Sequence, residues 1–172
     1  RRLVQHLTLN HLEPNLLLMT GLNDKTVVLA GPFGLLMQNL TTRLAEHGAD
    51  VALLTDDAKG AQRVCQNIMD MREVSEKYGR AAAFECLVKD RKSAEDNFSR
   101  SAEAFGSTDI YIDTYMFNTR LPFFADKDLG DVTPKVSEAF QKSQIMTSVA
   151  ATFLKGRSRG RILYLFHELD MW

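Results

Sequence analysis

The stretch 27-VVLAGPFGLLMQNLTTRLAEHGADVALLTDD-57 decides the fold. It begins within a short apolar run, residues 26–30, whose β-branched side chains are typical of a buried strand. Residues 35–47 then carry leucines at helical spacing, and Gly48 is a natural residue just past a helix end. Residues 51–54 form a second apolar run. A strand, a helix and a second strand in this order predict a β-α-β unit with parallel strands.

The same alternation of strands and helices continues along the chain. Each expected strand is a continuous apolar run, so we expect both faces of the sheet to be covered. Right-handed crossovers then give an α/β fold with a doubly wound parallel sheet, a Rossmann-like three-layer αβα architecture of strand order 3-2-1-4-5. The remaining expected helices are residues 58–78, 93–105 and 133–155, and the remaining strands are 81–88, 110–114 and 161–166.

Composition restricts the class of protein. The chain has 172 residues, 45% of them hydrophobic and 25% charged, with a net charge of -1. These values fit one Rossmann-like domain over residues 21–172, preceded by an N-terminal arm over residues 1–20. A nearly neutral chain has no general attraction to nucleic acid or anionic membranes. No apolar run approaches the roughly 18 residues of a membrane span, so we expect a cytoplasmic protein.

At this point the sequence resembles a known family, the short-chain dehydrogenases/reductases, over about residues 24–168. The resemblance rests on 24-DKTVVLAG-31, 43-RLAEHGADVALL-54, 105-FGSTDIYI-112 and 159-RGRIL-163. In the family these regions hold the first strand, a helix end with the second strand, the fourth strand and the fifth strand. The resemblance implies a Rossmann fold and, in family members, NAD(P)-dependent oxidoreduction.

The glycine-rich turn of the family, T-G-x-x-x-G-x-G, is mostly absent from this chain. A register fixed on Gly48 puts its four specified positions on Ala30, Gly31, Leu35 and Met37, so only the first glycine is kept. The later glycines admit the pyrophosphate and allow close packing of the helix on the strand. Leu35 and Met37 are therefore expected to fill this space.

Four residues remain as weak candidates for binding a dinucleotide, namely Gly31, Phe33, Gly34 and Asp56. Gly34 matches the second family glycine if the loop is one residue shorter. Asp56 could hold the ribose of NAD(H), or it could be a solvated or helix-capping aspartate. A helix N-terminus still points its amides toward this turn, although Pro32 removes one N–H donor. Our main expectation is that no cofactor binds, with NAD(H) as the alternative.

The other functional positions of the family differ as well. They are the adenine-contacting acid, the N-N-A-G motif, the catalytic Asn and the catalytic Ser, and they fall on Leu87, on 113-DTYM-116, on Ala139 or Ser143, and on His167. The catalytic Tyr and Lys would come after Trp172. Since the structural pieces persist while these positions all differ, we expect no catalytic residue in this sequence.

Other chemistry has little support. The four histidines have no zinc-binding spacing, and no P-loop or nucleophile elbow occurs, so no metal site is expected. Cys65 and Cys86 fit free buried thiols. Asp113 and the pair His167 and Glu168 end predicted strands, where they could do acid–base work or serve as polar strand ends. The basic segment 155–161 could contact phosphate or form a solvated turn.

Two regions suggest contacts with other molecules. The predicted loop 115–131 carries many large apolar side chains, which either fold over the cofactor cleft or form a partner surface. The strand 161–166 is almost entirely apolar and lies near the last residue of the sequence, so it leaves an open edge unless the chain continues or another chain covers it. A homo-oligomer or a protein partner at either region is expected, with no nucleic acid and no membrane.

Three functional interpretations remain open. The first is a short-chain-dehydrogenase-like Rossmann domain that has lost dehydrogenase activity and acts in binding, scaffolding or oligomerisation. The second is an NAD(P)-dependent short-chain oxidoreductase whose Tyr and Lys lie outside the sequence given. The third is a sensor of a small ligand that uses the remodelled cleft.

Overall fold

The computed structural model describes the backbone of residues 22–116, 129–155 and 160–165, and their side chains outside 129–133. The expected N-terminal arm, the centre of the predicted loop 115–131, and the pair His167 and Glu168 lie outside the described residues. The elements are β1 (Thr26–Ala30), α2 (Leu35–Glu46), β2 (Asp50–Thr55), α3 (Ala58–Val74), β3 (Ala81–Glu85), α4 (Arg91–Phe105), β4 (Ile110–Asp113), α5 (Leu129–Leu154) and β5 (Arg161–Tyr164).

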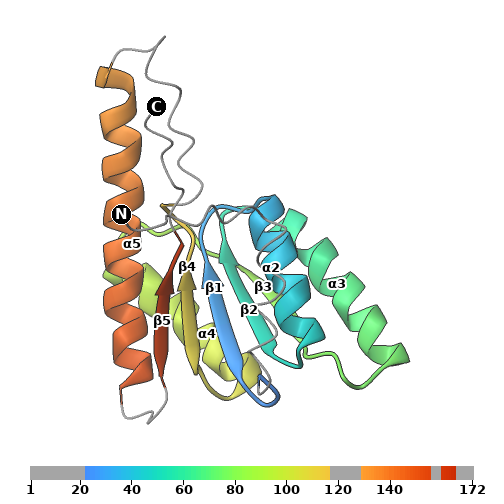
Figure 1. The fold of residues 1–172 in the computed structure, drawn as a ribbon. Coiled ribbons are helices and arrows are strands. Elements are labelled where there is room, and N and C mark those ends of the chain that lie inside the picture. Colours follow the sequence, from blue (N-terminus) through green and yellow to red (C-terminus); the bar gives the residue numbers. More distant parts are fainter. Residues whose placement is uncertain (1–21, 117–128, 156–159, 166–172) are drawn as a thin grey trace, which may run out of the picture.

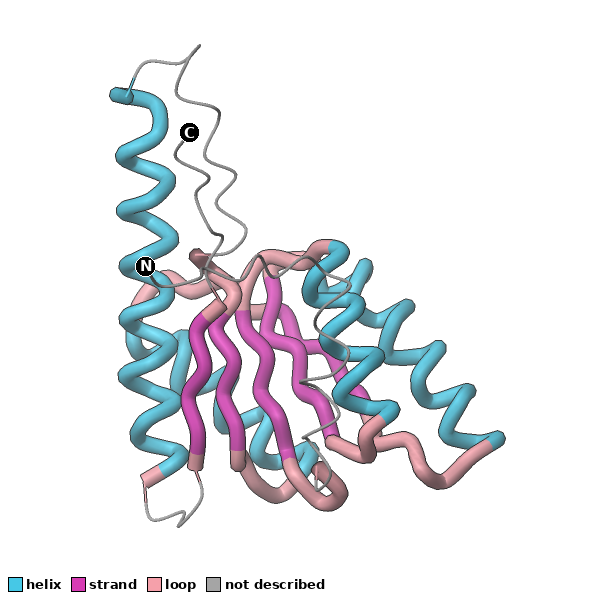
Figure 2. The backbone as a smooth tube through the Cα atoms, viewed as in Figure 1, coloured by secondary structure: helices cyan, strands magenta, loops and turns pink. Residues whose placement is uncertain are grey.

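The described strands form one parallel sheet of order β3-β2-β1-β4-β5. Helices α2 and α3 pack on one face of this sheet, while α4 and α5 pack on the other (Figures 1 and 2). Each face has its own apolar core, because successive side chains of a strand point to opposite sides. The predicted fold class and strand order are confirmed.

The central strands are buried as the apolar runs predicted. Every residue of β1 and β4 is buried, as is every residue of β2 after Asp50. The edge strand β5 differs, since Leu163 and Tyr164 are 41% and 43% exposed. The expectation that both faces of every strand are covered is therefore wrong for β5 in the described structure, because it lies at the sheet edge and pairs only with β4 among the described strands.

Several predicted helix ends are confirmed by their local chemistry. Gly48 and Gly106 adopt positive φ angles of 84° and 82° just after α2 and at the end of α4. Asp90 caps α4 through a reciprocal pair of hydrogen bonds with Ser93, so this helix begins at Arg91, two residues before the predicted start. Helix α3 stops at Val74 rather than at the predicted residue 78, so Gly79 lies beyond the helix end. A Cβ at Gly79 would overlap the Ala49 carbonyl, so the glycine permits close approach of two backbone segments instead.

Two further boundaries differ from prediction by three residues or more. Strand β3 ends at Glu85, rather than at residue 88, because its pairing with β2 ends there. Helix α5 begins at Leu129, whereas the predicted helix began at residue 133. The predicted loop is shorter as a result, and Pro134 lies inside the helix.

Candidate functional site

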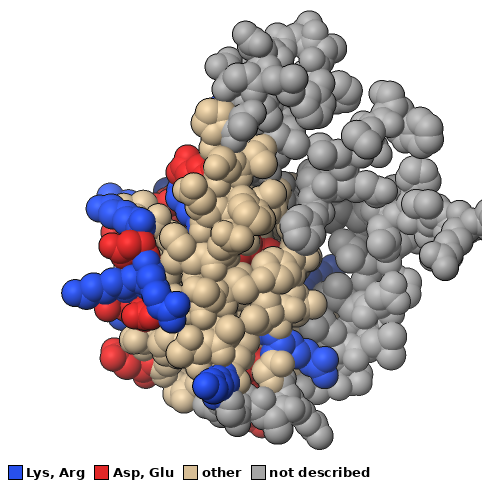
Figure 3. Space-filling model, turned by 90° about the vertical axis from the view of Figure 1, so that its left-hand side faces the viewer, with Lys and Arg blue, Asp and Glu red and all other residues tan. Residues whose placement is uncertain are grey.

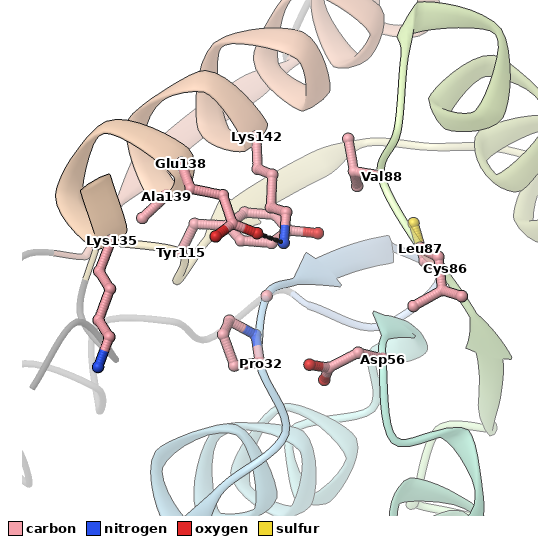
Figure 4. Close-up of a pocket in the computed structure, with 11 residues that line it drawn as sticks. Pro32, Asp56, Cys86, Leu87, Val88, Tyr115, Lys135, Glu138, Ala139 and Lys142 are labelled. Carbon is pink, nitrogen blue, oxygen red and sulfur yellow. Dashed lines mark ion pairs between the residues drawn. The ribbon is translucent and has the colours of Figure 1, made fainter.

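The direction in which the chain connects its strands reverses between β1 and β4, and a pocket lies at this point of the sheet edge. The connection after β1 leads to β2 on one side, and the connection after β4 leads to β5 on the other side. The loops that follow β1 and β4 therefore leave the sheet edge in opposite directions. A cavity of about 220 Å³ opens at these carboxyl ends (Figure 4). Its walls are the turn after β1, the ends of β2, β3 and β4, and one face of α5. Open parallel sheets place their ligands at this location.

Gly31 lies at the pocket wall, and the fold itself requires a glycine there. Its φ is 146°, and an added Cβ would overlap the hydroxyl of Thr114. Thr114 is fixed in turn, because its backbone N–H and its hydroxyl both donate to the carbonyl of Ala30, at 2.9 and 3.1 Å. The retained glycine therefore has a structural reason that involves no cofactor.

The other three cofactor candidates divide between two places. Asp56 lines the pocket, where its carboxylate accepts from the Thr55 hydroxyl at 3.2 Å. Phe33 packs against the core on the α2 and α3 side, and Gly34 is the N-cap of α2; neither residue is among those that line the pocket. The neighbouring Asp57, and not Asp56, caps α3 by accepting from the N–H of Gly60 at 2.9 Å. The helix-capping interpretation of Asp56 is therefore wrong.

Leu35 and Met37 take different roles in the structure. Met37 is fully buried in the core beneath α2, so a large side chain fills the contact between helix and strand that the family keeps small. Leu35 is 73% exposed. The expectation that both residues fill the turn is correct for Met37 and wrong for Leu35, because Leu35 is at the first position of α2 and points outward.

A buried carboxylate lies at the end of β4. Asp113 accepts hydrogen bonds from the Tyr111 and Ser143 hydroxyls at 2.8 and 3.0 Å, and from the backbone N–H of Tyr115 at 3.0 Å. Burial raises the pKa of Asp113 above its usual value, although these three donors oppose the shift. The hydrogen bond from the Ser143 hydroxyl connects the end of β4 to α5. The cluster therefore fixes α5 relative to the sheet.

The pocket contains no activated nucleophile in the part of the chain that the structure describes. Burial raises the pKa of the Cys86 thiol to about 11, so the thiol stays protonated near neutral pH. Burial also raises the pKa of Tyr115 well above its usual value. Among the described residues, no group of three or more His, Cys, Asp or Glu side chains could hold a metal ion.

One face of α5 supplies the pocket residues that the sequence did not predict. Lys135, Glu138, Ala139 and Lys142 recur at helical spacing and form the wall opposite Asp56 (Figure 4). Lys142 Nζ lies 2.6 Å from Glu138 Oε1. The helical spacing of these residues was visible in the sequence, but the spacing alone does not show that they border the carboxyl edge of the sheet.

The opposite flank of α5 borders a second, more apolar cavity of about 560 Å³. Phe140, Thr147 and Tyr164 are among its lining residues, and the Tyr164 and Thr147 hydroxyls lie 3.0 Å apart. Figure 3 looks at this side of the molecule, and the charged side chains of the described residues gather mainly to one side of it. The centre of the described surface in this view is therefore poor in charge.

The strand order and the position of the first pocket define a Rossmann-type domain. No protein-family model matches the chain, and no curated protein matches it. Solved structures do match. They include an NAD+-bound xylitol dehydrogenase (TM-score 0.67, 19% identity), a short-chain dehydrogenase from Mycobacterium smegmatis (0.66, 18%) and one from Mycobacterium thermoresistibile (0.64, 20%). The chain therefore has the fold of the short-chain dehydrogenases, and the predicted resemblance is confirmed at the level of fold.

These neighbours are longer proteins. The matches cover 83%, 83% and 84% of this chain, but only 53%, 58% and 52% of the three neighbours. The chain thus spans about half the length of the structures that it resembles. None of the described helices combines the length and the apolar character needed to cross a bilayer.

Proposed function

We propose that this chain is a Rossmann domain of the short-chain dehydrogenase fold that lacks the dehydrogenase reaction and acts by binding, scaffolding or oligomerisation. The observation that carries the proposal is the pocket at the switch point. Its volume of about 220 Å³ is below the roughly 300–1,000 Å³ of typical ligand pockets. Tyr115 occupies one of its walls, where the resemblance puts a small residue. A mononucleotide fits such a space better than a dinucleotide does.

The turn after β1 supports the same proposal. A dinucleotide-binding turn offers backbone N–H groups to the pyrophosphate. Here the Gly31 N–H already donates to the Leu54 carbonyl at 3.1 Å, and Pro32 has no N–H. Two of the nearest donors are therefore removed from phosphate binding.

Thermal unfolding with and without dinucleotide tests the proposal. At about 100 times its Kd a ligand stabilises a protein by about 2.7 kcal/mol. We expect NADH and NADPH at millimolar concentration to leave the melting temperature unchanged, because neither binds tightly. A rise of about 4 °C or more with either compound would contradict the proposal.

A second candidate function is NAD(P)-dependent oxidoreduction with the catalytic Tyr and Lys outside the sequence given. Asp56 favours it, because this acid lines the pocket at the end of β2, where a ribose would lie. The nicotinamide cofactor would then be NAD(H), since an acid at this position repels the 2′-phosphate of NADP. Turnover of NADH by a chain extended with a Y-x-x-x-K segment would establish this candidate in place of the first.

The exposed edge of the sheet supports a role in association. We propose that a second copy of this chain or a protein partner covers β5 or the 115–131 loop, in a cytoplasmic protein that binds no nucleic acid and no membrane. Leu163 and Tyr164 give β5 an apolar, exposed surface. Sedimentation equilibrium should therefore show a dimer or a larger species for the wild-type chain, and a shift toward monomer for Leu163→Lys. A wild-type monomer at all concentrations would exclude the homo-oligomer.

A further inference from the structure

We propose that the pocket at the switch point binds a nucleoside 5′-monophosphate, with the phosphate held by Lys142 and Lys135 of α5 instead of by the turn after β1. This inference rests on the proposed function, because a domain that bound a dinucleotide in the usual way would place phosphate at that turn.

The length of α5 puts these lysines over the pocket. A helix of 26 residues is about 39 Å long, whereas the neighbouring strands of four residues span about 13 Å. The helix therefore extends beyond the carboxyl edge of the sheet (Figure 1). Ser143 fixes the rotation of the helix through its hydrogen bond to Asp113. With that face turned to β4, the face with Lys135, Glu138 and Lys142 borders the pocket.

The lysine charges are available to an anion. Lys142 pairs with Glu138, whose side chain is 63% exposed, and exposed ion pairs contribute little to stability. A phosphate can therefore replace Glu138 as the partner of Lys142 at small cost. Lys135 lies two turns before Lys142 on the same face of α5 (Figure 4), and its flexible stem can bring a second charge toward the same anion.

The opposite wall carries complementary chemistry. The Asp56 carboxylate faces the pocket from the end of β2 (Figure 4) and can accept hydrogen bonds from a ribose diol. Leu87, Val88 and Tyr115 provide apolar and aromatic surface beside it, which suits a base. A ligand that matches both walls has hydroxyl groups at one end and an anion at the other. Inorganic phosphate would use only the lysines and would meet repulsion from Asp56.

Calorimetric titration with AMP, adenosine, ribose 5-phosphate and inorganic phosphate tests this assignment. We expect AMP to bind most tightly. Lys142→Gln should weaken AMP binding by roughly two- to five-fold or more, and Lys135→Gln by less, because single exposed charges contribute on this scale. Glu138→Gln should strengthen AMP binding by a similar factor, since it releases Lys142. Adenosine binding should not respond to any of the three changes.

Lys155→Gln is the matched control, because it removes the same charge just past the other end of α5. The assignment is overturned if AMP does not bind at millimolar concentration, if adenosine binds as tightly as AMP, or if Lys142→Gln weakens binding no more than Lys155→Gln does. If NADH binds tightly and neither lysine substitution changes its affinity, the proposed function is overturned instead. Failure of AMP together with failure of NADH would overturn only the present inference.

Discussion

Replacing Gly31 with alanine should destabilise the domain by about 3 kcal/mol or more. Two costs add. The φ of 146° is unfavourable for any residue with a Cβ, and that Cβ would overlap the Thr114 hydroxyl and lie 3.1 Å from the Thr114 carbonyl carbon. The hydroxyl cannot move away freely, because it donates to the Ala30 carbonyl. Urea unfolding followed by circular dichroism measures the change in free energy.

Gly34→Ala is the matched control three residues further along the same turn. Gly34 has an extended φ of -173°, and a Cβ there would meet no atom within 4 Å. We expect a change below about 1 kcal/mol, which is the scale of N-cap effects. Equal effects of the two substitutions would contradict the view that Gly31 is required by its contact with Thr114.

Replacing Asp113 with alanine should destabilise the domain by about 3–5 kcal/mol, since removing one partner from a buried polar cluster leaves the others unsatisfied. The Tyr111 and Ser143 hydroxyls and the Tyr115 N–H would lose their acceptor together. Asp113→Asn is the matched control. Its amide keeps one acceptor, and both hydroxyls can turn to accept from its NH₂ group, so we expect a much smaller loss. Similar losses for both variants would refute this account of the cluster.

Comparing the wild type with Asp113→Asn also predicts how the stability of the domain changes with pH. Burial raises the pKa of Asp113 in the folded state above its unfolded value, which is near 3.9. Protonated Asp113 therefore contributes to the stability of the folded state. This contribution is fully present below the unfolded pKa and is lost as the pH rises through the folded pKa. The stability of the wild type relative to Asp113→Asn should therefore fall as the pH rises above about 4. A relative stability that rises with pH would contradict the raised pKa.

The fold could be predicted because local signals agree with global ones. The apolar runs of β1, β2 and β4 are buried as expected, and Gly48 and Gly106 end their helices in the conformation that glycine favours. β5 was harder to interpret, because an apolar run has the same pattern at the centre and at the edge of a sheet. The exposure of β5 depends on which strands lie beside it, and the sequence of its four residues does not determine those neighbours.

The site was predicted only in part, for reasons of tertiary geometry. Asp56 follows a strand and so could be assigned to the sheet edge from sequence. The role of Gly31 could not, because its partner Thr114 is distant in sequence and meets it only through the pairing of β1 with β4. Lys135 and Lys142 were not predicted as pocket residues. They lie on a helix that extends beyond the carboxyl edge of the sheet, and which of its residues border the pocket depends on the length and rotation of the helix. The start of α5 at Leu129 was itself outside the prediction.

The central claim is that the Rossmann fold persists here without a working dinucleotide site. The measurement that tests it most directly is the dissociation constant of NADH, determined by titration calorimetry on the wild-type chain. Our account predicts no saturable heat with NADH up to millimolar concentration, because the Gly31 N–H is already bonded to Leu54, Pro32 has no N–H, and Tyr115 forms one wall of the small pocket. A dissociation constant in the micromolar range would contradict it.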